Sequence, residues 1–111
     1  MALVPDAAVC LLLEVIEATC AVWGGERVGL RISPLNSFNS MADSDPVGLV
    51  TWLAGRLNDF NLAYLHVMRA DFFQQQHGDV MTLARAAFRG VLIGNMAYTA
   101  AEADAAIAAA A

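Results

Sequence analysis

Three short apolar segments recur along this chain, and stretches with helical periodicity separate them. The segments run from Arg27 to Ser33, from Leu62 to Met68 and from Val91 to Asn95. Their starts lie roughly 30–35 residues apart, the length of a βα unit, so consecutive strands joined by helices are expected to run parallel. Because the segments are apolar on nearly every residue, both faces of each strand are expected to be covered. The repeat therefore predicts an α/β fold, either a barrel or a doubly wound sheet.

Four helices are predicted from apolar periodicity and from residues that begin or end helices. The first covers residues 6–23, with Asp6 as N-cap and Gly24 and Gly25 as the stop. The second covers residues 46–60 with Asp45 as N-cap, and the third covers residues 79–89 with Gly90 as the stop. The final helix begins with the capping box Thr99-Ala100-Ala101-Glu102. The predicted core-facing residues of the first helix are Leu12, Val15, Ile16, Thr19 and Trp23. Cys10 and Cys20 fall on this helix about 15 Å apart along its axis, so both are expected to be buried free thiols.

The sheet is predicted to be part of a barrel rather than a doubly wound nucleotide-binding sheet. No G-x-G-x-x-G follows any of the strands, and the chain has no G-x-x-x-x-G-K-[ST] motif. A closed (βα)8 barrel takes eight strands and about 250 residues, so three strands cannot close one. We therefore expect one domain over residues 1–111, a truncated TIM barrel of about three parallel strands alternating with four helices. An unrelated small doubly wound binding domain is a weaker alternative.

The composition limits the partners that the chain is expected to have. Apolar residues make up 59% of the chain and charged residues only 15%, which is more apolar surface than a small domain can bury. We expect either self-association through exposed sheet edges or a larger body that covers the excess. The net charge of −5 and the absence of lysine argue against nucleic acid and anionic membranes as partners. No apolar run is long enough to span a bilayer and no basic leader precedes the first helix, so a soluble, cytoplasmic protein is expected.

Arg31 places a permanent charge in the middle of the first apolar strand. One interpretation is a buried ion pair with a neighbouring strand or helix. The other interpretation is functional, because the functional groups of parallel α/β folds lie at the carboxyl ends of the strands and Arg31 is near that end. The motifs that accompany Arg31 bear on this choice.

Three motifs accompany the strands. They are ERVGLRISPLNSFNSMADSDP from Glu26 to Pro46, LAYLHVM from Leu62 to Met68, and FRGVLIGNMAYTAAEADAAI from Phe88 to Ile107. In order and spacing they resemble the second half of the old yellow enzyme family of FMN-dependent NAD(P)H oxidoreductases, the ene reductases. The resemblance implies an eight-stranded barrel with FMN at its carboxyl-end face, to which this chain would supply strands five, six and seven.

The resemblance also implies a flavin site on this chain. Arg31 matches the family arginine that points at the N1/O2 edge of the isoalloxazine ring, where a guanidinium can donate to both atoms as negative charge builds. Gly94, Asn95, Met96 and Ala97 match the turn whose backbone N–H groups hold the FMN phosphate, with Met96 where the family usually has glycine. The implied activity is hydride transfer from NAD(P)H through FMN to a small activated alkene.

The resemblance assigns no catalytic residue to this chain, and no metal site is expected. The family's substrate-binding His pair and its proton-donating Tyr belong to an earlier strand, so an incomplete chain without turnover of its own is expected. His66 is expected to be a packed core histidine and His77 a solvated one. Two functions follow: an FMN-binding ene reductase of which this chain is part, or a non-catalytic half-barrel that self-associates or pairs with a complementary half.

Overall fold

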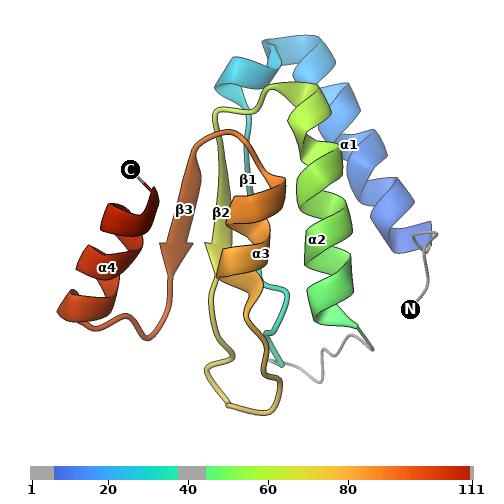
Figure 1. Ribbon diagram of the computed structural model, residues 1–111. Coiled ribbons are helices and arrows are strands. Elements are labelled where there is room, and N and C mark those ends of the chain that lie inside the picture. The colour runs from blue at the N-terminus through green and yellow to red at the C-terminus, as the bar shows by residue number, and fades with distance from the viewer. Residues whose placement is uncertain (1–6, 38–44, 111) are drawn as a thin grey trace.

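The chain forms a three-stranded parallel sheet with strand order β1-β2-β3 and helices along it (Figure 1). The computed structural model describes residues 7–37 and 45–110. Its elements in chain order are α1 (Ala7–Trp23), η1 (Gly25–Arg27), β1 (Gly29–Ile32), α2 (Pro46–Leu57), η3 (Asn58–Phe60), β2 (Tyr64–Met68), α3 (Val80–Ala87), β3 (Leu92–Asn95) and α4 (Ala100–Ala110). The expected alternation of four helices with three parallel strands is confirmed. The predicted N-cap Asp6 and the FNSM part of the first motif lie outside the described residues.

Side-chain caps begin α2, α3 and α4; those of α2 and α4 were predicted from the sequence, whereas Asp79, which was placed inside the third helix, is the N-cap of α3. Asp45 and Asp79 each accept a hydrogen bond from the amide three residues ahead, at 3.1 Å in both helices. Thr99 and Glu102 form the reciprocal capping box of α4, with distances of 3.1 and 3.2 Å. These contacts satisfy N–H groups that have no partner within the first helical turn, which explains why the helices start where they do.

The core lies between the sheet and the layer of α1, α2 and α3. Its buried apolar residues are Val9, Ile16, Leu35, Val50, Leu53, Ala54, Leu57, Leu62, Leu65, Val67, Val80, Ala84 and Phe88. Figure 1 shows α2 and α3 side by side over the sheet, and these two helices contact each other directly. The central strand β2 contributes the fully buried Leu65 and Val67, so the core is thickest over the middle of the sheet.

Helices cover only one face of the sheet within the described residues. Exposure alternates in β2, where Leu65 is fully buried and Tyr64 is exposed. Arg31, His66 and Ile93 are register partners across the three strands, so their side chains share one face. We call this the open face, and it consists of Gly29, Arg31, Tyr64, His66, Met68, Ile93 and Asn95. The expectation that both faces are covered is wrong here, because three strands do not form the opposite wall that fills the interior of a closed barrel.

The first helix buries only part of the stripe that its sequence predicts, because Leu12 and Ile16 face the core and other predicted residues do not. The residues of α1 that contact the core are Val9, Leu12, Leu13, Ile16 and Cys20. Val15 and Trp23, which were expected to face the core, are 54% and 62% exposed. Both cysteines are free, but Cys10 is exposed and Cys20 only half-buried, so the prediction of two buried thiols is wrong. Because α1 is apolar around most of its circumference, periodicity alone does not select its buried face.

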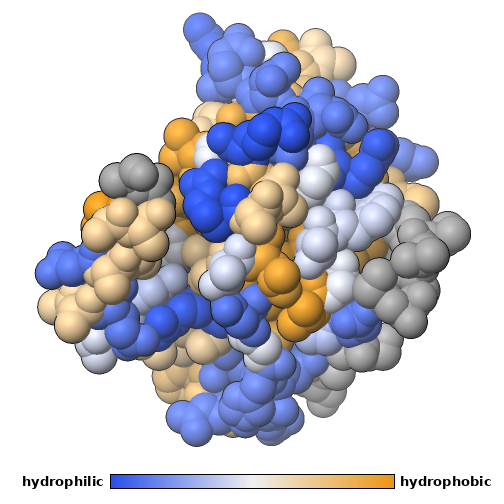
Figure 2. All heavy atoms as spheres, viewed as in Figure 1, coloured by the Kyte–Doolittle hydropathy of each residue, from blue (hydrophilic) through white to orange (hydrophobic). Residues whose placement is uncertain are grey.

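The last helix, α4, is alanine-rich and leaves most of its side chains in solvent. Ile107, its largest apolar residue, is 71% exposed. Figure 2 shows the moderately apolar surface of this helix at the left of the view. In the described parts of the chain, no helix combines the length and the apolarity that crossing a bilayer requires.

Candidate functional site

Arg31 lies on the open face near the carboxyl end of β1. Its side chain is exposed, and it forms no hydrogen bond or ion pair with any residue that the structure describes. The buried ion pair that was one interpretation of its sequence context is therefore not formed among these residues. A guanidinium with five donors and a permanent charge is left available to a ligand at this face.

A hydrogen bond between side chains joins β2 and β3, the two strands that do not contain Arg31. His66 Nε2 on β2 lies 3.1 Å from Asn95 Oδ1 at the end of β3. Because an amide oxygen only accepts hydrogen bonds, this geometry makes Nε2 the donor and leaves the Asn95 NH2 group available as a donor. His66 is half-buried on the open face, so the prediction of a packed core histidine is wrong. The parallel register thus brings Arg31, His66 and Asn95 to one face.

The segment from Gly94 to Ala97 comprises the last two residues of β3 and the first two of the turn after it, where the backbone is unusual. Met96 and Ala97 have φ angles of 90° and 58°, in the left-handed region that residues with a side chain rarely adopt. Gly94 has no room for a side chain, because a Cβ built there would lie 2.7 Å from Met81 Cε and 3.1 Å from the Tyr98 hydroxyl oxygen. The four residues predicted to hold a phosphate therefore span the carboxyl end of β3 and the strained start of the turn after it.

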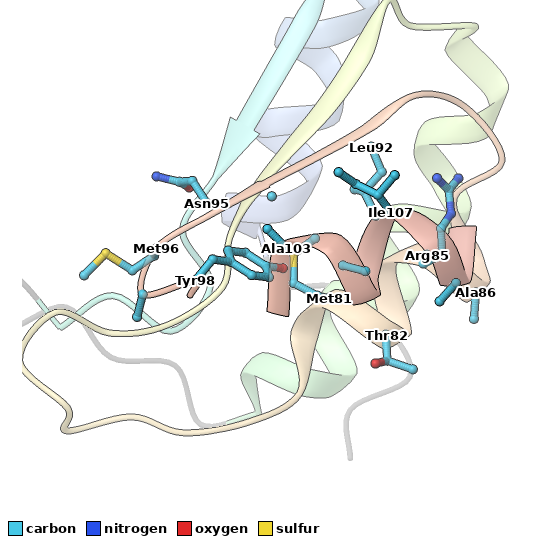
Figure 3. Close-up of a pocket in the computed structure, with 14 residues that line it drawn as sticks. Met81, Thr82, Arg85, Ala86, Leu92, Asn95, Met96, Tyr98, Ala103 and Ile107 are labelled. Atoms are coloured by element: carbon cyan, nitrogen blue, oxygen red, sulfur yellow. The ribbon is translucent and has the colours of Figure 1, made fainter. Parts of the chain in front are cut away.

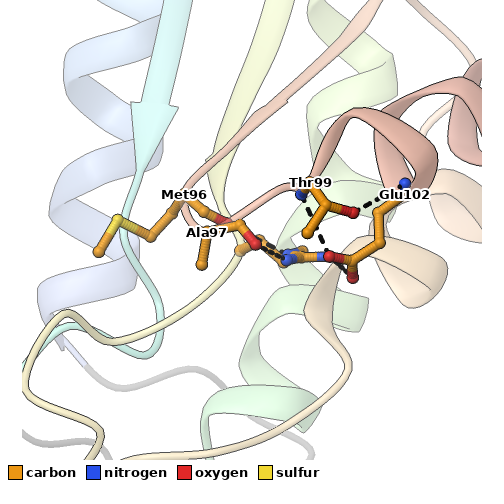
Figure 4. Close-up of polar contacts among 5 residues, drawn as sticks. Met96, Ala97, Thr99 and Glu102 are labelled. Atoms are coloured by element: carbon orange, nitrogen blue, oxygen red, sulfur yellow. Dashed lines mark hydrogen bonds and ion pairs between the residues drawn. The ribbon is translucent and has the colours of Figure 1, made fainter.

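Arg69, immediately after β2, contacts this turn with its whole guanidinium group. Nε donates to the Met96 carbonyl oxygen at 3.2 Å, and Nη2 donates to the Ala97 carbonyl oxygen. Nη1 pairs with the Glu102 carboxylate at 2.9 Å, and the guanidinium carbon lies 3.8 Å from the centre of the Tyr98 ring. The hydrogen bond from Arg69 lowers the pKa of Glu102 below its usual value. Figure 4 shows the Met96 and Ala97 carbonyl groups and the Glu102 carboxylate that these contacts involve.

The sequence alone did not single out Arg69. In the sequence this residue is only a charge at the end of an apolar run. Its partners Met96 and Glu102 lie 27 and 33 residues later in the chain, and the parallel register places them beside it. The one available signal is position, since Arg69 directly follows an apolar strand at the functional end of the predicted sheet.

A buried carboxylate organises the loops that follow β1 and β2. Asp71 accepts hydrogen bonds from the backbone amides of Ser37, Phe73, Gln75 and Gln76, at 3.0 to 3.2 Å. Burial by itself raises the pKa of Asp71, but the hydrogen bonds from Ser37 and the loop amides outweigh it and hold the pKa well below its usual range. The ionised carboxylate therefore joins two loops at the carboxyl ends of the strands, beside the candidate site.

A groove of about 890 Å³ lies between α3, β3 and α4 (Figure 3). Apolar side chains line much of it, among them Met81, Leu92 and Ile107. Leu92 faces away from the open face, because alternate residues of a strand point to opposite sides of the sheet. Arg31 and His66 do not line the groove, but Asn95 and the turn residues Met96 and Ala97 lie at one end of it.

The arrangement defines a class of fold. Parallel strands joined by helices, with the helices over one face and polar groups at the carboxyl ends, form an arc of a (βα)8 barrel. Among the described residues, no three His, Cys, Asp or Glu side chains are grouped to hold a metal ion. The chemistry of the described site is instead that of arginine and main-chain donors, which suits an anionic organic ligand.

Known proteins of the same class match this chain in sequence. No protein-family model matches it. A probable flavin mononucleotide-dependent alkene reductase from Leishmania infantum is 45% identical over 96 residues, which are 86% of this chain and 26% of that protein. A putative 12-oxophytodienoate reductase from Oryza sativa subsp. japonica is 33% identical over 92 residues, which are 78% of this chain and 24% of that protein.

Solved structures of related proteins match the fold. The old yellow enzyme from Trypanosoma cruzi superposes with a TM-score of 0.87 and 42% identity, over 91% of this chain and 27% of that one. Morphinone reductase in complex with tetrahydroNAD superposes with a TM-score of 0.74 and 32% identity, over 89% of this chain and 26% of that one.

The chain belongs to the old yellow enzyme family, as the resemblance of its motifs implies. It spans about a quarter of the length of the relatives that it matches. The prediction of a partial TIM barrel is confirmed, because these neighbours are TIM barrels of which the chain covers one part.

Proposed function

We propose that this chain forms part of the FMN site of an NAD(P)H oxidoreductase of the old yellow enzyme type, an ene reductase. In this proposal residues 1–111 are one truncated barrel domain that supplies strands five to seven. The observation that carries the proposal is the exposed Arg31 guanidinium on the open face, which has no partner among the described residues. The flavin mononucleotide named for the Leishmania infantum relative and the tetrahydroNAD bound to morphinone reductase support the choice of cofactors.

The residues of the site fit FMN in charge and in donor chemistry. Arg31 would donate to the N1/O2 edge of the isoalloxazine ring, because a guanidinium stabilises negative charge there without changing its own protonation. Gly94, Asn95, Met96 and Ala97 would hold the phosphate through main-chain N–H groups. Bound FMN would supply hydride transfer from NAD(P)H to a small activated alkene. Turnover belongs in this proposal to the complete barrel and not to the chain alone.

Arg31→Ala is expected to weaken FMN binding by about tenfold or more, since a hydrogen bond to a charged group contributes about 1.5–3 kcal/mol. The measurement is a titration of FMN with the purified chain, followed by flavin fluorescence and visible absorbance. Saturable quenching that Arg31→Ala weakens would support the proposal.

Arg89→Ala is the matched control for this titration. Arg89 is an exposed arginine that precedes β3, at the end of the sheet opposite the candidate site, and only its backbone amide contacts a described residue. Its replacement is expected to leave FMN affinity unchanged. Absence of saturable binding, or the same loss in both variants, would count against the proposed site.

A second candidate function is a half-barrel that associates with itself or with a complementary half. Among residues 7–37 and 45–110, no strand pairs with the outer edge of β1 or of β3, and Tyr64 and Ile93 on the open face are 38% and 41% exposed. Sedimentation equilibrium at micromolar concentration is expected to show a dimer or a larger assembly. A single monomeric species at these concentrations would argue against this function.

A further inference from the structure

Arg69 binds three consecutive carbonyl groups at the end of β3. Its backbone amide donates to the Asn95 carbonyl oxygen at 2.9 Å, and its guanidinium donates to the carbonyl oxygens of Met96 and Ala97. Arg69, which directly follows the neighbouring strand β2, therefore orients the Met96–Ala97 and Ala97–Tyr98 peptide groups, with both carbonyl oxygens pointing toward it.

The peptide geometry carries this orientation to the N–H groups of the turn. In a trans peptide the C=O group and the following N–H group point in opposite directions, and the described residues contain no cis peptide. Because the Met96 and Ala97 carbonyls point at Arg69, the amides of Ala97 and Tyr98 point away from it. Neither amide donates a hydrogen bond to any group that the structure describes. Two adjacent unpaired N–H groups on one side of a turn form an anion-binding arrangement.

The turn depends on outside contacts because its backbone is unfavourable. Met96 and Ala97 have positive φ angles although neither is glycine. Charge-assisted hydrogen bonds such as those from Arg69 are among the strongest that a protein offers to a carbonyl group. The Glu102 carboxylate and the Tyr98 ring contact the same guanidinium, which keeps Arg69 in the position that the turn requires.

We propose that Arg69 is a positioning residue for a phosphate monoester, because it directs the Ala97 and Tyr98 amides toward the phosphate group of FMN. The inference rests on the proposed function, which identifies the ligand as FMN, and it adds Arg69 as a residue that determines which flavin is preferred. The preference of the chain for FMN over riboflavin, which lacks the phosphate, depends on Arg69. Arg31 acts on the ring that the two flavins share and does not distinguish them.

The ratio of FMN affinity to riboflavin affinity tests this role. Arg69→Met removes every side-chain donor, and Arg69→Lys keeps the charge but loses the planar fork that can bind two carbonyls at once. Both variants are expected to lower the ratio by about tenfold and to leave riboflavin affinity unchanged. If Arg69 acted only through its positive charge, Arg69→Lys would instead keep the wild-type ratio of FMN affinity to riboflavin affinity.

Arg85→Met is the matched control for the Arg69 variants. Arg85 also binds two carbonyl groups, those of Phe88 and Gly90, but it does so before β3 rather than after it. Its replacement is expected to lower thermal stability and to leave the ratio of the two flavin affinities unchanged. A fall in the ratio for Arg85→Met equal to that for Arg69→Met would make the effect a general loss of structure and overturn the inference.

A measurement without flavin separates this inference from the proposed function. Inorganic phosphate added to the 15N-labelled chain is expected to shift the amide resonances of Ala97 and Tyr98 in the wild type and in Arg31→Ala. The same titration is expected to leave these resonances unmoved in Arg69→Met and Arg69→Lys, because their N–H groups are no longer held on one side of the turn.

The outcomes distinguish the two claims. If no flavin binds, the proposed function fails for this chain, and the phosphate titration still decides the role of Arg69. If FMN binds and Arg69→Lys keeps the wild-type ratio, the role of Arg69 is overturned while the proposed function stands. Equal amide shifts in the wild type and in Arg69→Met, or no shift in the wild type, also overturn it.

Discussion

Phe88→Ala is expected to lower the free energy of unfolding by about 3–5 kcal/mol. The Phe88 side chain is 2% exposed and is among the largest buried side chains of the core. It follows α3 directly, and its ring packs so closely against Gly90 that a Cβ built there would lie 2.9 Å from Phe88 Cζ. Truncation therefore removes apolar burial and leaves a cavity between α3 and β3 that the surrounding close-packed residues fill only in part.

Urea unfolding followed by far-UV circular dichroism measures this change as a shift of the midpoint. Phe72→Ala is the matched control, because the Phe72 side chain is 69% exposed in the loop after β2. We expect it to change the free energy of unfolding by less than about 0.5 kcal/mol. If the two alanine variants had the same midpoint, Phe88 would not be part of the core that the structure shows.

Gly25→Ala is expected to destabilise the fold by about 3 kcal/mol or more, an effect of overpacking against backbone atoms. A Cβ built on Gly25 would lie 1.9 Å from the Phe60 carbonyl oxygen and 3.1 Å from the Asn61 carbonyl oxygen. Neither atom can move aside as the end of a side chain can. The Gly25 carbonyl oxygen also accepts hydrogen bonds from the amides of Val28 and Ala63, at 2.9 and 3.1 Å, so a shift of the backbone would weaken both.

Gly55→Ala is the opposite case and serves as the control for Gly25→Ala. Gly55 lies on the exposed side of α2, and a Cβ built there meets no atom within 4 Å. Because alanine favours the helix over glycine, we expect this variant to be more stable by about 0.5–1 kcal/mol. Thermal unfolding of both variants measures the contrast. A Gly25→Ala chain as stable as the parent would contradict the close approach of the segments before β1 and β2.

Local sequence was sufficient to predict the elements and several of their ends. Asp45 caps α2 and Thr99 caps α4 through amides only three residues away, and Gly24 ends α1 with a φ of 81°. Contacts of this range depend on the neighbouring residues and not on the rest of the fold. The buried face of α1 is the exception, because Val15 and Trp23 fit the predicted periodicity as well as the residues that the core covers.

The candidate site was predicted only in part. The order and spacing of motifs pointed to Arg31 and to the segment that begins at Gly94, and both lie at the carboxyl ends of their strands. The hydrogen bond between His66 and Asn95 and the contacts of Arg69 were not predicted. The partners in these contacts are 27 to 33 residues apart, and no local pattern marks one residue as the partner of the other.

By itself the sequence determined the order of helices and strands, the capping of α2 and α4 and the family to which the chain belongs. Only the tertiary structure decided that Arg31 is exposed without a partner on an open face and that Arg69 reaches the turn after β3. The physical reason is that parallel pairing brings the carboxyl ends of strands together whatever their separation in the chain. The register of that pairing depends on the packing of a whole face, which only the folded sheet contains.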